Sequence, residues 1–514
     1  MNKKFVLLLL LSFHIQCAFS QQQCTTKGKD FWFGFMENED DVNLIELSVY
    51  ISATQNTSGV LEIPGSSTTI PFAVNANSTI QLNIPNSTAL FSTGIIENKG
   101  IHITAVNDIS VFALNYREHT SDASLIFPTT NLGSKYRVLT IHGWNYGEGE
   151  EYLIVATADN SQVEITPVNG ASTTINLNKG EAYQIIQSAN LTGTLIEEVN
   201  GKKIAVFCGS LCDFIGNCAA CDHLYEQMLP INRFGKYFIT VPLATKAKDY
   251  FRILANYDNT QISINGLIIA TLNAGEAHQF SSNISNYISC SSPVFIYQYA
   301  QGFQCDHVGD PFSVIVPPLE QSIEDITFNA FTSNVITDYY VNIVTQTSYA
   351  SLLLLDGNPV SFTPVPSYNN YSYAQVPVNS GNHQLYSPKG FLATVYGFGY
   401  AESYGYSAGF SMINLIDPPE NINIILELPN VITPNNDGSN DYFIPVNIEG
   451  IKSMNTTIYN RWGKIVYSTD KLNIEWDGKN NNQEVANGVY FYTCEYKGLN
   501  EKSYSVNGTV TVIN

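Results

Sequence analysis

The chain has 514 residues and a formal net charge of −21 at pH 7, with 24 basic and 45 acidic side chains. Such an excess of negative charge repels phosphate backbones, so nucleic acid is excluded as a favoured partner. Charged residues make up only 13%, whereas aromatic residues make up 12%. This usage is typical of exported β-proteins rather than helical enzymes, and the length implies several domains.

Residues 1–20 have the pattern of a secretory signal peptide. A basic start is followed by an apolar run from Phe5 to Phe13 and then by small residues before Gln21. The run is too short to span a bilayer, and no later segment has 18 apolar residues in a row. We therefore expect an exported chain that begins near Gln21 and has no transmembrane segment.

Residues 21–411 repeat with a period near 100 residues. Each unit contains an Asn-x-Gly or Asn-x-Asn turn followed by Gln, and this turn marks the same position in every repeat. The four turns begin at Asn75, Asn178, Asn273 and Asn379. A pair of short strands precedes each mark and an apolar strand follows it, so each unit holds about seven or eight strands. The predicted units are approximately 21–136, 137–237, 238–328 and 329–411.

The predicted fold class is all-β, with tandem antiparallel β-sandwich repeats and a further sandwich at the C-terminus. The alternative for the repeat region is a β-propeller formed from about 28 strands. The repeat is longer than the roughly 40–50 residues of a propeller blade, which favours sandwiches. Residues 412–428 are predicted to form a linker.

Nine cysteines occur, and eight remain when Cys17 leaves with the signal peptide. In an exported chain this even number predicts disulfides. We expect Cys290 to pair with Cys305, and two bridges to form, in one of three connectivities, within the set Cys208, Cys212, Cys218 and Cys221. Cys24 and Cys494 are left without an assigned partner. The four crowded cysteines could instead hold zinc, but oxidation on export favours disulfides.

A Cys-Asp-His element occurs twice, at Cys221-Asp222-His223 and at Cys305-Asp306-His307. A degenerate copy that keeps only the Asp occurs at Ser121-Asp122-Ala123. Because buried polar groups are hydrogen-bonded, we predict that Asp222, His223, Asp306 and His307 anchor their loops. An active site is seldom duplicated, so the recurrence favours scaffolding. The alternative is a general acid–base site built from Asp222, His223 and Glu226.

The segment after the first copy resembles the N-terminal domain of IgG-Fc-binding proteins. The resemblance is carried by Glu226-Gln227-Met228-Leu229-Pro230 and Phe234-Gly235-Lys236-Tyr237, extends to Gly28-Lys29-Asp30-Phe31-Trp32, and covers roughly residues 25–410. The family's Leu-Pro-Pro and Trp-Gly appear here as Met228-Leu229-Pro230 and Phe234-Gly235. Immunoglobulin binding by this chain does not follow from the resemblance.

Residues 429–514 contain short β-branched and aromatic runs separated by Asn, Asp and Gly turns. Two motifs lie among these runs and turns, Asn460-Arg461-Trp462-Gly463 and Trp476-Asp477-Gly478. The segment resembles the C-terminal sorting domain of gliding-motility-associated and type IX secretion proteins of Bacteroidetes. The resemblance implies an Ig-like sandwich, recognition by the type IX secretion machinery, and release from the cell or attachment to its surface.

One loop of this domain could hold a cation. Asn435, Asp437, Asn440 and Asp441 cluster side-chain oxygens around a glycine turn, and Ca²⁺ takes six to eight oxygen ligands. The spacing does not follow the EF-hand pattern, and such runs are commonly turns, so a simple turn is the alternative. No other cofactor is predicted.

The leading hypothesis is a non-enzymatic exported protein that binds an extracellular glycan or protein through its repeats. The sequence contains no Gly-x-Ser-x-Gly, His-Glu-x-x-His or phosphate-binding glycine loop, which favours this hypothesis. The alternatives are a secreted hydrolase acting on polysaccharide or protein, and a purely structural surface component. The sequence does not name the ligand.

Overall fold

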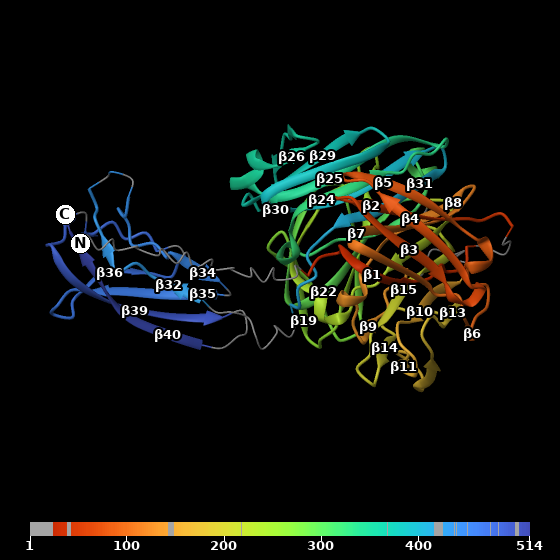
Figure 1. Ribbon diagram of the computed structural model, residues 1–514, viewed down its shortest axis with the longest axis horizontal. Helices are drawn as coiled ribbons and strands as arrows, with labels where there is room; N and C mark the ends of the chain where they lie inside the picture. The colour runs from red at the N-terminus through yellow and green to blue at the C-terminus, as the bar shows by residue number, and fades with distance from the viewer. Residues whose placement is uncertain are drawn as a thin grey trace, which may run out of the picture. The chain divides into compact units, whose positions relative to one another are not determined.

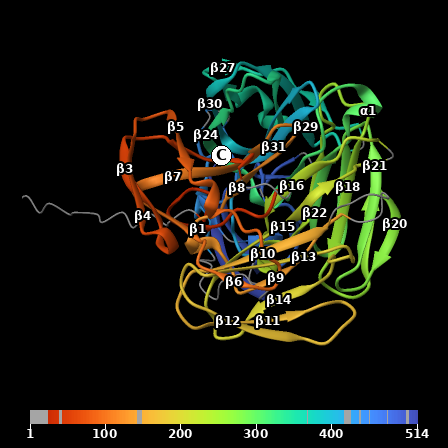
Figure 2. The same cartoon turned by 90° about the vertical axis from the view of Figure 1, so that its right-hand side faces the viewer.

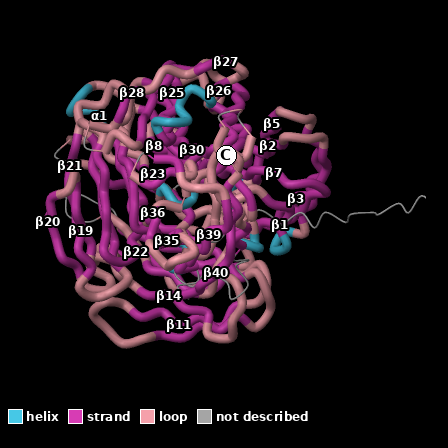
Figure 3. The backbone as a smooth tube through the Cα atoms, turned by 90° about the vertical axis from the view of Figure 1, so that its left-hand side faces the viewer, coloured by secondary structure: helices cyan, strands magenta, loops and turns pink. Residues whose placement is uncertain are grey.

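The computed structural model describes residues 24–38, 43–141, 149–216, 218–366, 368–415, 425–435, 437, 439–449, 451–472, 474–481, 483–498 and 503–513. The predicted signal peptide and residues 416–424 of the predicted linker lie outside these ranges. The chain divides into two compact units, Met1–Ile413 and Asn414–Asn514, each described by itself. Both consist of strands and loops with only short helices (Figure 3). In the described ranges, no helix has the length and apolar character needed to cross a membrane.

The first unit contains four copies of one antiparallel sandwich. The strands of repeat 1 are β1 (Gly28–Phe33), β2 (Glu46–Ala53), β3 (Thr57–Ile63), β4 (Thr68–Val74), β5 (Ser78–Ile84), β7 (Ile101–Arg117) and β8 (Thr120–Ile126). Those of repeat 2 are β9 (Lys135–Arg137), β10 (Glu150–Ala156), β11 (Ser161–Thr166), β12 (Thr173–Leu177), β13 (Ala182–Gln187), β14 (Leu195–Glu198), β15 (Ile204–Asp213) and β16 (Asp222–Gln227). The short β6 (Ile96–Glu97) of repeat 1 pairs with β13 of repeat 2.

Repeats 3 and 4 follow the same order. Repeat 3 has β17 (Gly235–Thr240), β18 (Asp249–Ala255), β19 (Thr260–Ile264), β20 (Leu267–Leu272), β21 (Ala277–Ser282), β22 (Asn286–Ala300) and β23 (Ser313–Ile315). Repeat 4 has β24 (Ile323–Ala330), β25 (Ile336–Gln346), β26 (Leu354–Leu355), β27 (Asn358–Pro359), β28 (Thr363–Pro364), β29 (Tyr371–Val378), β30 (Gly381–Gly399) and β31 (Glu402–Gly409).

In each repeat the long penultimate strand belongs to both layers of the sandwich. The first half of β7 pairs with β1 and β3, and its second half pairs with β2 and β8. The strands β22 and β30 do the same in repeats 3 and 4, whereas in repeat 2 the strand is interrupted to give β14 and β15. The alternation in the sequence is that of half-buried strands: Ser161, Val163 and Ile165 of β11 are buried, and the residues between them are partly exposed.

The last strands of the four repeats meet at the centre of the unit. Strand β8 packs against β16 and β31, and β23 packs against the same two strands, so the four repeats form a ring. Figure 2 shows the repeats following one another around this centre in the order of their colours, from orange through yellow and green to cyan. Every residue of these four strands is buried. We call the place where they meet the axis.

The two ends of the first unit close the ring. The backbone N–H of Thr26 donates to the carbonyl of Phe410 at 3.0 Å, and Thr25 forms an antiparallel bridge with Ser411. The prediction of all-β sandwich repeats is confirmed. The closed ring was not predicted, and its members are whole sandwiches rather than the four-stranded blades of a propeller.

Strand pairing corrects the predicted repeat boundaries. Strand β9 pairs with β14 of repeat 2, β17 with β22 of repeat 3, and β24 with β30 of repeat 4. The predicted boundaries at 136/137, 237/238 and 328/329 cut through these strands or assign them to the preceding unit. Repeats 2, 3 and 4 therefore begin a few residues before the approximate predicted boundaries, at β9, β17 and β24.

The three internal junctions share one close contact. Three of the four axial strands, β8, β16 and β23, are followed by a proline and a 3₁₀ turn, namely η3 (Thr129–Asn131), η4 (Ile231–Arg233) and η5 (Leu319–Gln321). A Cβ on the glycine that precedes or opens the first strand of a repeat would meet the proline at the end of that repeat. The separations between Cβ atoms would be 2.4 Å for Gly28 and Pro128, 2.5 Å for Gly133 and Pro230, and 2.2 Å for Gly235 and Pro318. Only glycine fits at these contacts.

The second unit is a small sandwich. One layer is a sheet in the order β33 (Val431–Ile432), β40 (Ser503–Val512), β39 (Gly488–Gly498), β35 (Ile451–Tyr459) and β36 (Ile465–Thr469) (Figure 1). The other elements are the pairs β32 (Ile425–Glu427) with β34 (Asn447–Glu449) and β37 (Lys479–Asn480) with β38 (Gln483–Glu484). Trp476, Phe443 and Tyr490 are buried in its core.

The disulfides differ from the prediction. Cys212 pairs with Cys221, and Cys218 pairs with Cys305, so the second bridge links repeat 2 to the loop after β22 of repeat 3. The expected bridge between Cys290 and Cys305 is wrong, because Cys290 lies in the core of repeat 3. Cys208 is also free and buried, and burial raises the pKa of both thiols to about 12. Cys24 and Cys494 are free as well, and among the free thiols of the described ranges Cys24 alone is exposed.

The bridges can be mapped on the purified chain. We expect a non-reduced digest to yield peptides joined through Cys212–Cys221 and Cys218–Cys305. Iodoacetamide should label Cys24 in the native protein, and Cys208, Cys290 and Cys494 only after unfolding, because their sulfur atoms are buried. A peptide joined through Cys290, or stoichiometric zinc, would contradict this assignment.

The glycine contacts give a second prediction. Gly133→Ala should lower the free energy of unfolding by about 1–3 kcal/mol, because the added methyl group overpacks the junction against Pro230. Gly34→Ala is the matched control: its Cβ would meet a flexible Leu153 methyl at 3.2 Å, so a smaller loss is expected. Denaturant unfolding of the full chain measures both. Equal losses in the two variants would contradict the proposed role of the junction.

Candidate functional site

Five carboxyl groups surround the axis. They are Asp122 in β8, Asp222 and Glu226 in β16, Asp310 just before β23, and Glu402 in β31, each at most 2% exposed. The four axial strands come from four different sandwiches, so their facing edges cannot form one continuous sheet. Backbone N–H groups at these edges therefore need other acceptors, because an unpaired buried amide is costly.

The carboxyl groups provide those acceptors. Asp122 accepts the backbone N–H of Tyr225 at 3.0 Å and of Ser313 at 3.2 Å, so one side chain of repeat 1 holds repeats 2 and 3. Glu226 accepts the N–H of Ile315 at 3.2 Å. Glu402 accepts the backbone N–H of His119 and, at 3.2 Å, the hydroxyl of Ser121, which joins repeat 4 to repeat 1.

Burial changes the charge of this cluster. Burial is the largest cause that raises the pKa of Asp122, Asp222 and Glu226 well above the usual range, and neighbouring carboxyl groups raise the pKa of Asp222 and Glu226 further. Burial also raises the pKa of Asp310 to about 6 and that of Glu402 above its usual value. Burial therefore favours the protonated form of Asp122, Asp222 and Glu226, which limits the negative charge at the axis.

The predicted anchors Asp222 and His223 lie in this sealed centre. Both are 0% exposed. Asp222 accepts the backbone N–H of His223, whose Nδ1 donates to the carbonyl of Ser210 at 2.9 Å while its Nε2 accepts from Asn115 at 3.2 Å. Burial lowers the pKa of His223 to about 3, so the ring is neutral. With Glu226 also buried, no substrate reaches the acid–base site considered from the sequence.

The second copy of the element has a different environment, so the two copies are not equivalent. Asp306 ends the short helix α1 (Phe303–Asp306) and accepts from the Gln301 amide at 2.8 Å and from the buried Lys246 ammonium at 3.3 Å. His307 is exposed and has left-handed backbone, with φ 61°. Its ring lies 5.5 Å from that of Phe303.

An open cleft lies between repeats 1 and 4, beside the axis. Its volume is about 330 Å³. Repeat 1 contributes alternate residues of β2 (Glu46, Ser48 and Tyr50), with Gln81, Leu114, Tyr116 and Ser121; repeat 4 contributes residues 331–336 and 402–404. Glu46 and Tyr116 are directly paired across β2 and β7, so they stand side by side at the rim. These residues could not be predicted from the sequence, because they are distant in the chain and follow no motif.

The floor and the rim of the cleft differ in character. Tyr50, Phe331 and Tyr404 form the floor, with ring centroids 4.1 Å apart for Tyr50 and Phe331 and 4.8 Å apart for Phe331 and Tyr404. These three rings are buried, whereas Glu46 is exposed and Tyr116 half-buried at the rim. The lining residues include two carboxyl groups, of Glu46 and Glu402, and no basic side chain.

The two sorting motifs of the second unit occupy different places. Asn460 caps a tight turn between β35 and β36, where its Oδ1 accepts the N–H of Trp462 and of Lys464, and Gly463 has φ 75°. Trp462 is 76% exposed. Trp476 is instead fully buried, and its Nε1–H donates to the carbonyl of Lys479 at 2.9 Å.

Asp477 and Gly478 complete the turn after Trp476. Asp477 accepts the N–H of Lys479 at 3.2 Å and pairs with its ammonium at 2.8 Å, and Gly478 has φ 68°. This second motif therefore builds the core and a turn of the module.

The predicted calcium loop is held by short-range turns. Asp437 accepts the N–H of Ser439 at 2.8 Å, and Asn435 accepts the N–H of Asp437 at 3.0 Å. Asn440 has left-handed backbone, with φ 56°, and Asp441 follows it. Within the ranges that the structure describes, no group of three or more His, Cys, Asp or Glu side chains is placed to hold a metal. Calcium binding stays a prediction.

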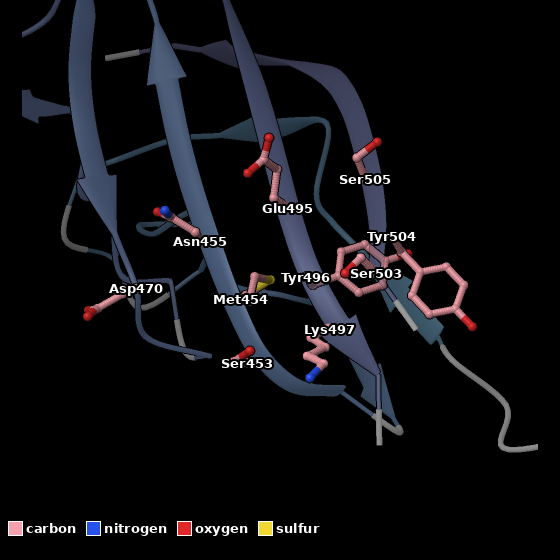
Figure 4. Close-up of a pocket in the computed structure, with 10 residues that line it drawn as sticks. All are labelled: Ser453, Met454, Asn455, Asp470, Glu495, Tyr496, Lys497, Ser503, Tyr504 and Ser505. Carbon is pink, nitrogen blue, oxygen red and sulfur yellow. The ribbon is translucent and has the colours of Figure 1, made fainter. Parts of the chain in front are cut away.

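A second hollow lies at one end of the five-stranded sheet of the C-terminal module, where β35 and β40 begin and β39 ends. It has a volume of about 700 Å³ and is open to solvent (Figure 4). Polar side chains of β35, β39 and β40 line it, among them Asn455, Glu495 and Lys497, and the rings of Tyr496 and Tyr504 stack at one end, 5.5 Å apart. Its residues form no acid–base or nucleophile constellation.

Comparison with known proteins covers both units. A family model described as IgGFc binding protein matches residues 122–397, and one described as CHU_C Type IX secretion signal domain matches residues 426–512. The human IgGFc-binding protein is 23% identical over 371 residues, which are 67% of this chain and 7% of that protein. The chain thus spans a small part of its relative's length.

Solved structures give weak overlaps. Dimeric latent PorU from Porphyromonas gingivalis is 10% identical over 60% of this chain and 31% of that one, with a TM-score of 0.13. A Ca²⁺-stabilised adhesin that helps an Antarctic bacterium bind ice is 9% identical over 95% of this chain and 100% of that one, with a TM-score of 0.12. Overlaps this weak carry no argument. The matches to residues 122–397 and 426–512 place the chain in the IgGFc-binding protein family and identify its C-terminal module as a type IX secretion signal domain, which directs it to the cell surface or the extracellular space.

Proposed function

We propose that the protein is a non-enzymatic extracellular binding protein whose ligand enters the cleft between repeats 1 and 4. The single observation that carries this proposal is the cleft itself. It is open, has a volume of about 330 Å³, and combines an aromatic floor with a polar rim. Concave sites of about 300–1,000 Å³ with a few converging polar groups are typical of ligand sites.

The lining of the cleft indicates the ligand chemistry. The lining contains carboxyl groups and no basic side chain, which disfavours an anionic ligand, because like charges repel. Glu46, Gln81 and the phenol of Tyr116 can hydrogen-bond the hydroxyl groups of a neutral glycan, and the carboxylate can hold a cationic side chain of a protein. A neutral glycan or a protein segment with Lys or Arg is the ligand that this lining supports.

One observation favours a hydrolase in the same cleft. Burial raises the pKa of Glu402, as suits a general acid, and Glu46 is exposed, as suits a general base. Glycosidases divide these two roles between a pair of carboxyl groups. Against this, Glu402 already accepts hydrogen bonds from the backbone N–H of His119 and the hydroxyl of Ser121, and these bonds link repeat 4 to repeat 1. Turnover of a polysaccharide or peptide that Glu46→Gln abolishes at unchanged stability would establish the hydrolase and displace the binding proposal.

The binding proposal predicts a local effect at Tyr116. The full mature chain, probed on glycan and protein arrays, should give a ligand whose affinity falls tenfold or more in Tyr116→Ala, because the half-buried ring at the rim is lost. Tyr386→Ala is the matched control: this tyrosine is 46% exposed on β30 and does not line the cleft. Equal affinities of Tyr116→Ala and wild type for every ligand found would refute the site.

The two aspartates of the repeated element should affect stability unequally. Asp222→Ala removes one of the two acceptors of the buried His223 N–H, which also donates to the hydroxyl of Thr120, and should cost about 1 kcal/mol of unfolding free energy. Asp306→Ala leaves the buried Lys246 ammonium without its carboxylate and should cost more, about 3–5 kcal/mol. Denaturant unfolding measures both losses, and array binding by folded Asp222→Ala should equal that of wild type. A stable Asp222→Ala variant without function would contradict the scaffold role.

A further inference from the structure

The second unit has an apolar half-face that its own fold does not use. The even-numbered residues of β39, such as Tyr490 and Cys494, face the core, so the odd-numbered residues lie on the outer face of the sheet. On this face Ile465, Tyr459 and Phe491 are neighbours in register across β36, β35 and β39, and Val489 follows Phe491 on the same side. Ile465, Val489 and Phe491 are 54%, 49% and 48% exposed.

The turn with Arg461 and Trp462 stands at the end of this apolar row, because it connects β35 to β36. Trp462 is 76% exposed, and the Arg461 guanidinium lies 4.4 Å from the centroid of its ring. The side chain of Asn460 and the φ of 75° at Gly463 account for the shape of the turn. The indole ring adds no packing to the core, and a large exposed apolar side chain without a structural role marks a contact surface.

The rest of the outer face is polar. The other end of the same strands lines the hollow that contains Asn455, Glu495 and Lys497 (Figure 4). The outer face is therefore divided into an apolar half, flanked by one arginine, and a polar half of mixed charge. A folded protein partner with an apolar patch and a carboxylate for Arg461 fits this division, whereas an anionic membrane surface would favour a cluster of basic residues.

We propose that the apolar half-face, with the Arg461–Trp462 turn at its edge, is the surface by which the type IX secretion machinery holds this module. The occupant follows from the family match, since a secretion signal domain must be bound by its exporter. The core-forming Trp476 motif keeps the sheet in shape, and the exposed Trp462 motif makes the contact. The inference rests on export and is independent of the cleft in the first unit.

Export of the full chain from a bacterium with a type IX system tests the proposal. The double variant Trp462→Ala/Phe491→Ser should reduce the extracellular and surface-bound fraction at least tenfold, with accumulation in the periplasm. Val446→Ser is the matched control: this residue is 71% exposed beside β34 of the other layer, and its export should equal that of wild type. Immunoblots of cell fractions measure both.

A folding control accompanies the test. Arg461→Glu changes only the charge on the exposed turn, and it should lower export severalfold while the retained protein stays as protease-resistant as wild type. Normal export of both the double variant and Arg461→Glu would overturn the proposal. Equal loss in Val446→Ser would also overturn it, because the effect would then be unspecific. Normal passage with lost attachment to the cell surface would assign the face to a membrane or surface contact instead.

Discussion

The hydrogen bonds that Asp122 accepts from two other repeats are the contacts on which the architecture of the first unit depends. Four strands that converge on an axis cannot complete one another as a sheet, and their edge amides would be buried without partners. Carboxyl groups from neighbouring repeats satisfy them. Burial of an ionised acid would be costly, so burial raises the pKa of Asp122 and Asp222 well above the usual range and favours their protonated form.

Closure of the ring also creates the candidate site. The cleft takes Glu46 and Tyr116 from the first repeat and Phe331 from the fourth, so it exists because the last repeat returns to the first. The pairing of Thr25 with Ser411 and the staple from Glu402 to Ser121 hold these repeats together. Stability at this junction and the shape of the cleft therefore rest on the same contacts.

The local features of the fold could be predicted from the sequence, and the contacts between repeats could not. Strands, turns and repeat period follow from alternation and from Asn and Gly at turns, which act over a few residues. Cys305 was expected to pair with Cys290, which is close in sequence, but Cys290 belongs to the core of its sandwich and Cys218 of another repeat is near in space. The same limit applies to Asp222 and Asp306. Both stand between Cys and His in the sequence, but Asp222 lies at the buried axis whereas Asp306 contacts the Lys246 ammonium.

The two tryptophan motifs of the C-terminal module show why motif matching alone does not separate folding from recognition. Trp476 and Trp462 both belong to the pattern that indicated a sorting domain, yet one is fully buried and the other 76% exposed. Burial explains the first without any partner, because its ring fills the core and its N–H is satisfied. The second contacts the Arg461 guanidinium but contributes nothing to the core, so the proposed contact outside the module gives it a role in recognition. The surface proposed for export lies wholly within the second unit and the cleft wholly within the first, so export and ligand binding need share no residue.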